Sequence, residues 1–433
     1  MSILEDPAYT VVPVPQATSG VAWLRAHVAR FSEGEDHARR RTLAERLLAT
    51  VDASSLRRPG APTANLAAAL GFPRNRALVA DVALVGAAYQ PYFVQSQEAD
   101  DALARLVDRA GGRWDEETAA RIALLVQSHH ATNALIAGAH PPVPATRRIS
   151  PKGEEVQVDL TATPFGAGRH ACPGEDHARA MADGAQAFRR LHDGPAPLVL
   201  PNAWDAASAA AFASAGFAAI GTTSLGVAAS QGLPDGEGLL LDETLALARR
   251  LATLPVPVTV DIEYGFGADL EELGAELSAM GIAGVNLEDG RGNGLADPAE
   301  QAELIRRLKA DAPELFVNAR VDTYWVGTAH DETLGRAQAY VDAGADGVFV
   351  PGLTDPTEIE RIVAAVPVPL NLLAGLPIPQ LTDLGVRRVS TGSLLFRSAI
   401  TAAVDAARRV RDGGDLPETM PYDTVQGLSG AFR

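Results

Sequence analysis

The chain has 433 residues, of which 47% are apolar and 21% charged, a composition typical of a folded protein with enough apolar material for two cores. Its formal net charge of −17 falls almost entirely after residue 180, which argues against nucleic acid or an anionic membrane as a partner. The single cysteine excludes internal disulfides and fits a reducing cytoplasm, and no signal peptide or membrane-spanning apolar run is expected.

The first predicted domain is mostly helical. Helical periodicity is clearest in EDHARRRTLAERLLATV (35–51) and in EETAARIALLVQSHHATNALIAGA (116–139). The second helix carries His129 and His130, and adjacent residues of a helix cannot face one point. At most one of these two histidines is therefore expected to reach a bound ligand.

A glycine-rich loop, TPFGAGRHACPG (163–174), contains the only cysteine, Cys172. Its glycines allow the backbone to wrap closely around a flat ligand, and backbone donors near the sulfur favour a thiolate. The order Phe-Gly-x-Gly-x-His-x-Cys-x-Gly resembles the haem-binding loop of the cytochrome P-450 family. That resemblance implies a haem whose iron is bound by Cys172, with His170 at a haem propionate.

Other segments of this domain resemble the same family. The resemblance implies further haem contacts by Arg148, in PPVPATRR, and by His37 and Arg41, in FSEGEDHARRR. The family's acid–threonine pair, which handles oxygen, is replaced by His130 and Ala131, so ordinary monooxygenase activity is not expected. A shortened haem-thiolate domain is one interpretation. The other is a degenerate domain that folds without haem and serves in oligomerisation or docking.

The two predicted domains comprise residues 1–184 and 185–433. In the second, short apolar strands alternate with amphipathic helices, and Asp242 and Asp331 are predicted to cap helix starts. The eight predicted strands lie at 197–203, 218–226, 256–265, 283–290, 314–325, 346–352, 368–375 and 386–395. This pattern predicts an α/β fold, a (β/α)8 TIM-type barrel preceded by the helical domain, with a doubly wound open sheet as the alternative.

Charged side chains follow the predicted strands at their carboxyl ends, where such a barrel holds its active site. Asp261 and Glu263 follow the third strand, Glu288 the fourth and Arg320 the fifth. Only one histidine, His330, lies in this half of the chain beyond residue 193. A metal site here would therefore use oxygen ligands, which favours Mg2+ or Mn2+. Arg320 is suited to bidentate binding of a substrate carboxylate or phosphonate.

Five runs in this half, LPNAWDAASA, TTSLGVAASQGLPDG, VDIEYGFG, VNLEDG and VNARVD, resemble the phosphoenolpyruvate mutase/isocitrate lyase superfamily. Its members act on small 2-oxo or 2-hydroxy acids, and they make or break C–C or C–P bonds through Mg2+-stabilised enolates. The resemblance places Asp261, Glu263 and Glu288 in the metal shell with Asp235 nearby, and gives Arg320 the substrate carboxylate. The residues it implies in substrate binding are Trp204, Thr223, Ser224, Leu225 and Asn318.

The loop after the fourth strand departs from the superfamily pattern. Its lyases carry a Lys-Lys-Cys-Gly-His loop whose thiol acts as acid and base, but EDGRGNGLADPAE (288–300) has neither cysteine nor histidine. The mutases carry a longer gating loop, for which only Arg291 and Asn293 could substitute. A thiol-dependent lyase is therefore disfavoured, while C–P and C–C chemistry both remain open.

Two classes of function follow. The first is a Mg2+-dependent enzyme acting on a small acid such as phosphonopyruvate, oxaloacetate or a 2-alkylmalate. The second is a non-catalytic barrel that binds the ligand as a sensor or scaffold for the haem-like module. Members of the superfamily exchange their last barrel helix in dimers and tetramers, so residues 396–412 predict a homo-oligomer, expected in the cytoplasm.

Overall fold

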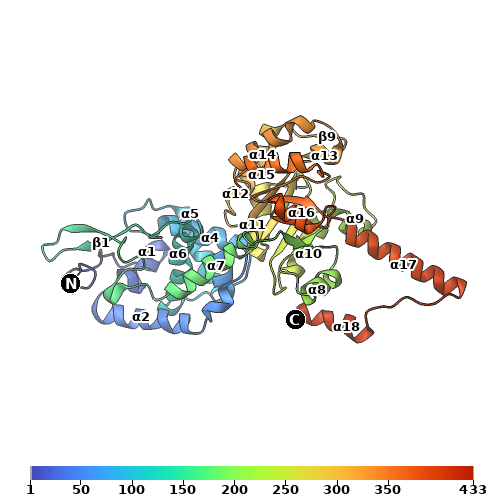
Figure 1. Ribbon diagram of the computed structural model, residues 1–433. Helices are drawn as coiled ribbons and strands as arrows, with labels where there is room; N and C mark the ends of the chain where they lie inside the picture. Colours follow the sequence, from blue (N-terminus) through green and yellow to red (C-terminus); the bar gives the residue numbers. More distant parts are fainter. Residues whose placement is uncertain (1, 433) are drawn as a thin grey trace. The chain divides into compact units, whose positions relative to one another are not determined.

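The computed structural model describes residues 2–432, which form two compact units, Met1–Gln186 and Ala187–Arg433 (Figure 1). Each unit has an apolar core of its own. The division falls within one helix, α7 (Glu175–Arg190). Between residues 2 and 432, none of the helices combines the length and the apolar character needed to cross a bilayer.

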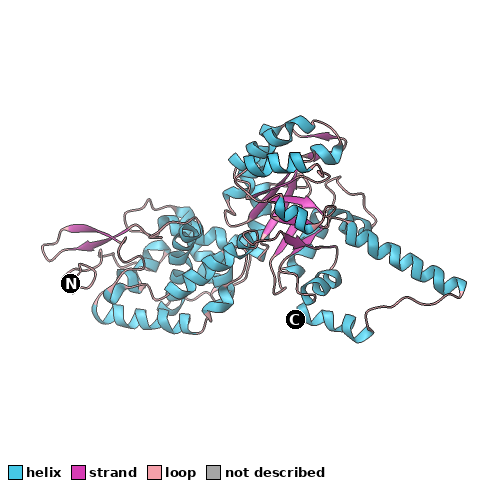
Figure 2. Ribbon diagram, viewed as in Figure 1, coloured by secondary structure: helices cyan, strands magenta, loops and turns pink. Residues whose placement is uncertain are grey.

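The first unit is built from helices and a two-stranded antiparallel sheet (Figure 2). In chain order its elements are α1 (Gly20–Ala26), η1 (Ala29–Phe31), α2 (Gly34–Ala49), η2 (Ala53–Leu56), α3 (Pro62–Ala69), α4 (Arg76–Ala88), α5 (Gln97–Arg109), α6 (Glu116–Ile136), β1 (Ala145–Ile149), β2 (Glu155–Asp159), η3 (Gly168–His170) and the beginning of α7.

Side-chain caps begin the three central helices of this unit. Asn75, Ser96 and Asp115 precede α4, α5 and α6, and each accepts a hydrogen bond from a backbone N–H in the first turn. The buried faces of these helices then supply much of the apolar core, with Leu103 and Leu125 fully inaccessible to solvent. Capping therefore sets where these helices begin, and burial of their apolar faces stabilises them.

An ion-pair cluster ties α2 to α6. Arg39 donates to both carboxylate oxygens of Glu116, and Arg40 donates to one of them, each at 2.8 Å. The hydrogen bonds from Arg39, and then those from Arg40, hold the pKa of Glu116 at about 2. Because the folded pKa lies below the unfolded value, this contribution to stability is present at neutral pH.

We expect Glu116→Gln to lower the free energy of unfolding by about 1 kcal/mol at pH 7, as for a partly exposed ion pair. The difference from wild type should disappear as the pH falls from about 5 to about 2, since protonation removes the charge that the substitution removes. Urea unfolding at several pH values measures it. Glu117→Gln, next to Glu116 in the first turn of α6, is the matched control, and an equal loss in both variants would contradict the assignment.

The second unit is an α/β fold with a nearly closed parallel barrel, consistent with a TIM-type architecture (Figure 2). Its elements are β3 (Leu198–Leu200), β4 (Asn202–Ala203), α8 (Ala206–Ser214), β5 (Ile220–Thr222), α9 (Ser224–Gln231), α10 (Leu241–Leu251), β6 (Val258–Asp261), α11 (Leu270–Met280), β7 (Gly284–Glu288), β8 (Gly290–Arg291), β9 (Gly294–Leu295), α12 (Pro298–Ala310), β10 (Phe316–Arg320), α13 (Thr323–Val326), η4 (His330–Glu332), α14 (Thr333–Asp342), β11 (Gly347–Phe349), α15 (Pro356–Ala365), β12 (Leu370–Leu373), α16 (Ile378–Asp383), β13 (Arg388–Ser390), α17 (Leu394–Asp412), α18 (Tyr422–Gly427) and η5 (Leu428–Phe432).

The barrel has nine strands where eight were predicted, because the first is divided at Pro201. The strand order runs β3-β13-β12-β11-β10-β7-β6-β5-β4, so the two halves of that first strand lie at its two ends. Asn202 holds this seam: its Oδ1 accepts from the backbone N–H groups of Thr391 and Gly392, and its Nδ2 donates to the Thr222 carbonyl at 2.7 Å. One amide side chain thus connects three segments where the barrel closes.

The predicted caps of two barrel helices are wrong by one or two residues. Helix α10 begins at Leu241, so Asp242 lies inside its first turn, where its charge still favours the helix N-terminus. Asp331 lies in η4, and α14 begins only at Thr333. Both aspartates therefore act on the helix through charge and not as caps.

Candidate functional site

Parallel strand pairing brings the predicted charged residues to one end of the barrel. In the pairing of β7 with β10, Glu288 lies opposite Arg320. In the pairing of β6 with β7, Asp261 lies opposite Asn286, two residues before Glu288. The carboxyl ends of these three neighbouring strands therefore form one charged site.

Arg320 is the cationic centre of this site. Its Nη1 lies 2.5 Å from Glu288 Oε2, and its Nε donates to Asp322 Oδ1 at 2.7 Å. Its guanidinium carbon lies 5.7 Å from the ring centroid of Trp325, a side chain that is 60% exposed. A guanidinium framed by carboxylates and an aromatic ring is pre-oriented to receive an anion.

The carboxylates around Arg320 outnumber it and are buried. Burial, with a further contribution from neighbouring acids, raises the pKa of Glu288 to about 8 and that of Asp261 to about 6. Burial also raises the pKa of Glu263, whose side chain is almost inaccessible and whose Oε1 has no hydrogen-bond partner. Glu263 further has a positive φ of 47°, a strained conformation for a residue other than glycine. This part of the site carries more negative charge than its own side chains neutralise.

The donor set fits a hard divalent cation that retains water ligands. Between residues 2 and 432, no group of three or more His, Cys, Asp or Glu side chains is arranged as a complete metal site. Mg2+ commonly binds through one or two carboxylates and keeps several waters, so it does not require such a group. The unpartnered Oε1 of Glu263 is the atom that most directly indicates a missing positive partner.

Four further predicted site residues lie on the segment that follows β5. Asp235 is exposed on the loop after α9, yet close enough to raise the pKa of both Asp261 and Glu263. Thr223 is buried directly before α9, whose first turn holds Ser224 and Leu225. Asp235 is thus linked to the acids by charge, and the roles of Thr223, Ser224 and Leu225 stay predictions.

Two other predicted substrate contacts have partners inside the unit. Trp204 packs edge-on against Phe396, with ring centroids 5.4 Å apart. Asn318 is buried inside the barrel and donates to Asn286 Oδ1 at 2.8 Å. Their role in substrate binding stays a prediction.

Two residues outside the predicted set of site residues fix the ends of the strands. Thr222 Oγ1 accepts the backbone N–H of Asp261 at 2.9 Å, which fixes the end of β6. Asp289 is fully buried, and accepts from Tyr340 Oη at 2.7 Å and from the Asp322 N–H at 2.8 Å. The polar side chain of Thr222 at a strand end is a signal that the sequence offers. No local pattern predicts the contact between Asp289 and Tyr340.

The family model described as phosphoenolpyruvate phosphomutase matches residues 188–411, which is more than half of the chain. The chain belongs to the phosphoenolpyruvate phosphomutase family. The match lies wholly within the second unit and includes every strand of the barrel. The protein is accordingly an enzyme of the lyase or mutase type, as its named relatives are.

Two relatives in sequence illustrate the family. An uncharacterized protein of Mycobacterium tuberculosis is 47% identical over 243 residues, which covers 55% of this chain and 94% of the relative. The 2-methylisocitrate lyase of Bacillus subtilis is 34% identical over 195 residues, covering 42% of this chain and 64% of the relative.

Two solved structures resemble the barrel. A phosphoenolpyruvate phosphomutase from Streptomyces platensis matches with a TM-score of 0.52 and 28% identity, covering 57% of this chain and 95% of that one. A phosphonopyruvate hydrolase, solved in complex with oxalate and Mg2+, matches with a TM-score of 0.50 and 27% identity over 57% of this chain and 95% of that one.

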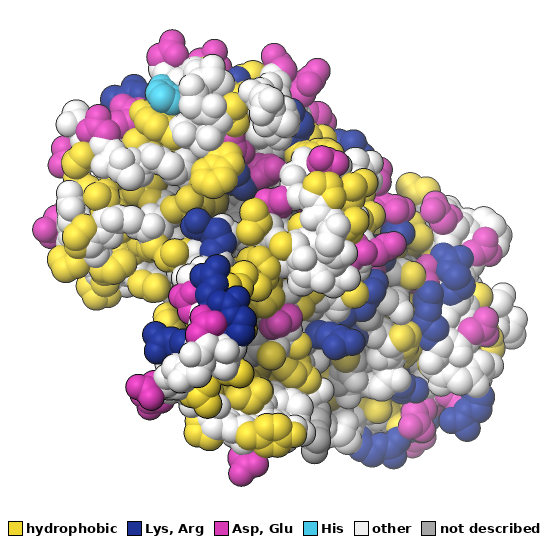
Figure 3. Space-filling model, turned by 90° about the vertical axis from the view of Figure 1, so that its right-hand side faces the viewer, with side chains coloured by type: hydrophobic (Ala, Val, Ile, Leu, Met, Phe, Trp, Pro, Cys, Tyr) yellow, Lys and Arg dark blue, Asp and Glu magenta, His cyan; other side chains and the backbone are white. Residues whose placement is uncertain are grey.

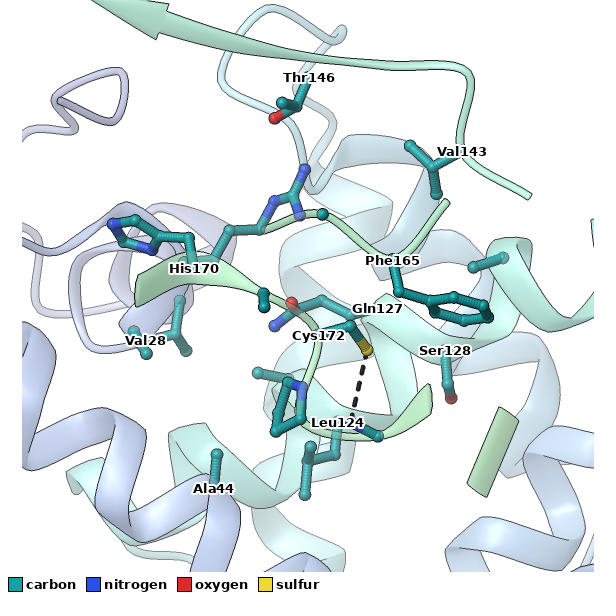
Figure 4. Close-up of a pocket in the computed structure, with 18 of the residues that line it drawn as sticks. Val28, Ala44, Leu124, Gln127, Ser128, Val143, Thr146, Phe165, His170 and Cys172 are labelled. Carbon is teal, nitrogen blue, oxygen red and sulfur yellow. Dashed lines mark hydrogen bonds between the residues drawn. The ribbon is translucent and has the colours of Figure 1, made fainter. Parts of the chain in front are cut away.

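Outside the phosphomutase-family domain, the first unit contains a cavity of about 240 Å³ (Figure 4). Its walls include all five residues assigned to haem from the sequence. These residues are Cys172, His170, Arg148, His37 and Arg41. Because they come from three separate stretches of the chain, the fold brings together what the sequence only suggested.

Two histidines at this cavity have buried nitrogen atoms that make no hydrogen bond. The rings of His37 and His170 lie 4.2 Å apart, and neither Nε2 atom is hydrogen-bonded, although His170 Nε2 lies 3.5 Å from Glu33 Oε1. Arg148 is buried beside the same wall, and burial lowers its pKa. Buried polar atoms without a hydrogen bond, beside a buried cation, are an arrangement that a polar group of a ligand can complete.

The cysteine loop holds its thiol in a fixed position. Cys172 Sγ accepts the backbone N–H of Gly174 at 3.4 Å (Figure 4), and its own N–H donates to the Phe165 carbonyl. Gly168 has a φ of +67°, and a Cβ there would come within 2.6 Å of the Leu4 carbonyl oxygen, so only glycine fits. The expected thiolate is not favoured, however, because loss of water around the sulfur outweighs the single donor and raises the pKa of Cys172, although the residue is exposed at the cavity wall.

The face of α6 toward the cavity differs from the one considered in the sequence. Ser128, Ala131 and Thr132 line the cavity. His129 instead contacts Thr63 Oγ1 at 2.8 Å, and the His130 ring lies against Gly86. Neither histidine lines the cavity, which is consistent with the expectation that at most one of them could reach a ligand there.

Proposed function

We propose that the barrel catalyses Mg2+-dependent making or breaking of a C–C or C–P bond in a small 2-oxo or 2-hydroxy acid, by way of an enolate. The observation that carries this proposal is the group of buried acids around Arg320, with the unpartnered carboxylate oxygen of Glu263 among them. The names of the relatives support it, since they include a lyase and a phosphonopyruvate hydrolase bound to oxalate and Mg2+.

Each residue of the site has a chemical role in this proposal. Asp261, Glu263 and Glu288 would hold the cation directly or through water, and Asp235 would add negative charge nearby. When bound, Mg2+ supplies Lewis-acid stabilisation of negative charge on the substrate. Arg320 binds the substrate carboxylate, and the start of α9 receives the other anionic end.

The residues of the loop after β7 limit which acid–base groups the reaction can use. Residues 289–297 contain no thiol or imidazole, so the acid–base step cannot use a cysteine from this loop. Arg291 and Asn293 are the only polar side chains near its turn, and Asn293 is exposed at the tip. A thiol-independent reaction fits this site, and it leaves C–P and C–C cleavage to be distinguished by experiment.

Proton and phosphorus NMR of the purified protein with Mg2+ tests the proposal. The candidate substrates are phosphonopyruvate, phosphoenolpyruvate, oxaloacetate and 2-methylisocitrate, each also tested with Glu288→Gln. Turnover that is lost in the variant supports the enzyme and identifies the bond cleaved. Tight binding of these acids without turnover, unchanged in Glu288→Gln, would instead favour the sensor or scaffold.

We also propose a homo-oligomer, supported by α17. None of its residues is buried, and Ile400, Val404 and Val410 are exposed by 51%, 43% and 66%. The helix projects from its unit (Figure 1). Figure 3, which views the molecule from the side on which α17 projects in Figure 1, shows apolar side chains among charged ones. Burying such a helix on a second copy removes apolar area from water. Sedimentation of the wild type and of Ile400→Asp tests this, since a monomeric wild type would contradict it.

For the first unit we propose haem binding, in which Cys172 would hold the iron. The proposal is supported by the unbonded Nε2 of His37 and by the positive charges of Arg148 and Arg41, which line the same cavity and would face haem propionates. When bound, haem supplies an iron centre whose electron density a thiolate increases. The protein's own part is to hold the sulfur on its glycine loop and to compensate the propionate charges.

A further inference from the structure

The loop after β7 folds into a small, well-bonded hairpin. Strands β8 and β9 pair antiparallel, with Gly290 opposite Leu295 and Arg291 opposite Gly294. The hairpin is closed at its base by a hydrogen bond from the Ala296 N–H to the Asp289 carbonyl at 2.8 Å. Its structure therefore depends on a few identifiable contacts, and most of them involve Arg291.

Most hydrogen bonds from the Arg291 guanidinium go to backbone carbonyl oxygens near the site. Its Nη1 donates to the carbonyl oxygens of Glu288 and Gly290 at 3.0 and 2.8 Å, and its Nη2 donates to Gln301 Oε1 at 3.0 Å. Gln301 is fully buried, and its Nε2 donates to the same Glu288 carbonyl at 3.1 Å. Two side chains thus fix the backbone of the residue that pairs with Arg320.

The flat face of Arg291 contacts a second segment. Its guanidinium carbon lies 4.7 Å from the ring centroid of Tyr264, a cation–π distance. The Tyr264 hydroxyl lies so close to Gly238 that a Cβ there would clash with it, while the Gly238 N–H donates to Glu263 Oε2 at 2.8 Å. The stack therefore connects the hairpin to the loop that holds Glu263.

The hairpin is also joined to the substrate-binding arginine. The Gly290 N–H donates to Asp322 Oδ2 at 3.0 Å, and the other oxygen of Asp322 accepts Arg320 Nε at 2.7 Å. Displacement of the hairpin would consequently disturb Arg320 as well as Glu288 and Glu263. Arg291 lies where these three connections meet, although it contacts none of these three side chains itself.

We infer that Arg291 is a positioning residue: stacked on Tyr264 and bonded to the Glu288 and Gly290 carbonyls, it holds the β8–β9 hairpin in one conformation and keeps Glu288, Glu263 and Arg320 aligned. The hairpin is then a fixed wall of the site. The inference rests on the proposed function only where ligand binding is measured. The conformation of the hairpin can be tested without any ligand.

Three single variants separate the contacts. Arg291→Lys keeps the charge but loses the planar fork, which cannot then reach two carbonyls and Gln301 together. Tyr264→Leu removes the ring, and Tyr264→Phe keeps it while removing only the hydroxyl. The readouts are hydrogen exchange of residues 289–297 without ligand, and calorimetric binding of oxalate with Mg2+.

We expect Arg291→Lys and Tyr264→Leu each to speed exchange at the Gly290 and Ala296 amides about tenfold, because local opening becomes easier. Each should also weaken oxalate binding about fivefold, while Tyr264→Phe stays within about twofold of wild type because the stacked ring remains. The double variant Arg291→Lys/Tyr264→Leu should be no worse than the more affected single variant, since both changes remove one shared contact.

Unchanged exchange in the hairpin of both Arg291→Lys and Tyr264→Leu would overturn the inference, as would strictly additive effects in the double variant. Exchange in α15, a helix of the same unit, serves as the internal control for global unfolding. A wild-type protein that binds no oxalate would contradict the proposed function. In that case the exchange rates alone decide the role of Arg291.

Discussion

Replacing Arg320 by methionine is expected to lower kcat/KM, for whichever acid the enzyme turns over, by about a thousandfold or more. The guanidinium provides a charge-assisted, bidentate contact to the substrate, and each tenfold loss corresponds to about 1.4 kcal/mol of transition-state stabilisation. Arg320→Lys should recover only part of this activity, because an ammonium group cannot keep the bonds to Glu288 and Asp322 while receiving a carboxylate.

Arg320→Met is also expected to lower the stability of the folded protein. Glu288 and Asp322 lose their shared cation, and breaking a buried pair in this way commonly costs about 3–5 kcal/mol. Thermal unfolding with and without Mg2+ measures this, and added Mg2+ should restore part of the loss. Arg361→Met, which changes an exposed arginine of α15, is the control. Activity within tenfold of wild type in Arg320→Met would contradict the assignment.

Replacing Cys172 by alanine is expected to remove the thiolate-type Soret band and to weaken haem binding about a hundredfold, because the axial bond is lost. His37→Ala should have a smaller effect, about tenfold, since it removes one of several groups facing a propionate. Absorption spectra during titration with haem measure both. The change at His37 tests the propionate contact specifically, because its buried Nε2 makes no hydrogen bond in the structure.

Arg46→Gln is the control for the haem experiment, because this arginine is exposed on α2, lies 3.8 Å from Glu117 and does not line the cavity. A colourless wild-type protein that does not take up added haem would contradict haem binding. It would support the alternative that the first unit folds around an empty or differently filled cavity and serves in docking. Because the burial of Cys172 raises its pKa, haem uptake should also improve as the pH rises and the thiol ionises.

Much of the barrel site could be predicted because parallel strands carry their ends to one face. Asp261, Glu288 and Arg320 each follow an apolar run, and that position alone indicates a shared edge. Their relation to one another could not be predicted in the same way. Which acid pairs with Arg320, and which oxygen of Glu263 remains unpaired, depends on side-chain conformations in the folded barrel.

The surroundings of a side chain were also decided by packing. Trp204 and Asn318 have residue types suited to substrate binding, and only the folded barrel shows that they also contact Phe396 and Asn286. His129 and His130 lie on the helix that lines the cavity, yet helical phase directs Ser128 and Thr132 toward it instead. A residue's chemistry is visible in a sequence, whereas its direction on an element depends on which face is buried.

By itself, the sequence determined the alternation of strands and helices, the oxygen-rich chemistry of the strand ends and the glycine loop around Cys172. These are local properties, since periodicity, caps and turn residues act over a few positions. Only the tertiary structure decided that Asn202 closes the barrel, that Arg291 stacks on Tyr264 and that burial raises the pKa of Cys172. Each of these depends on contacts between distant segments or on loss of water around a side chain, and both arise only when the chain packs.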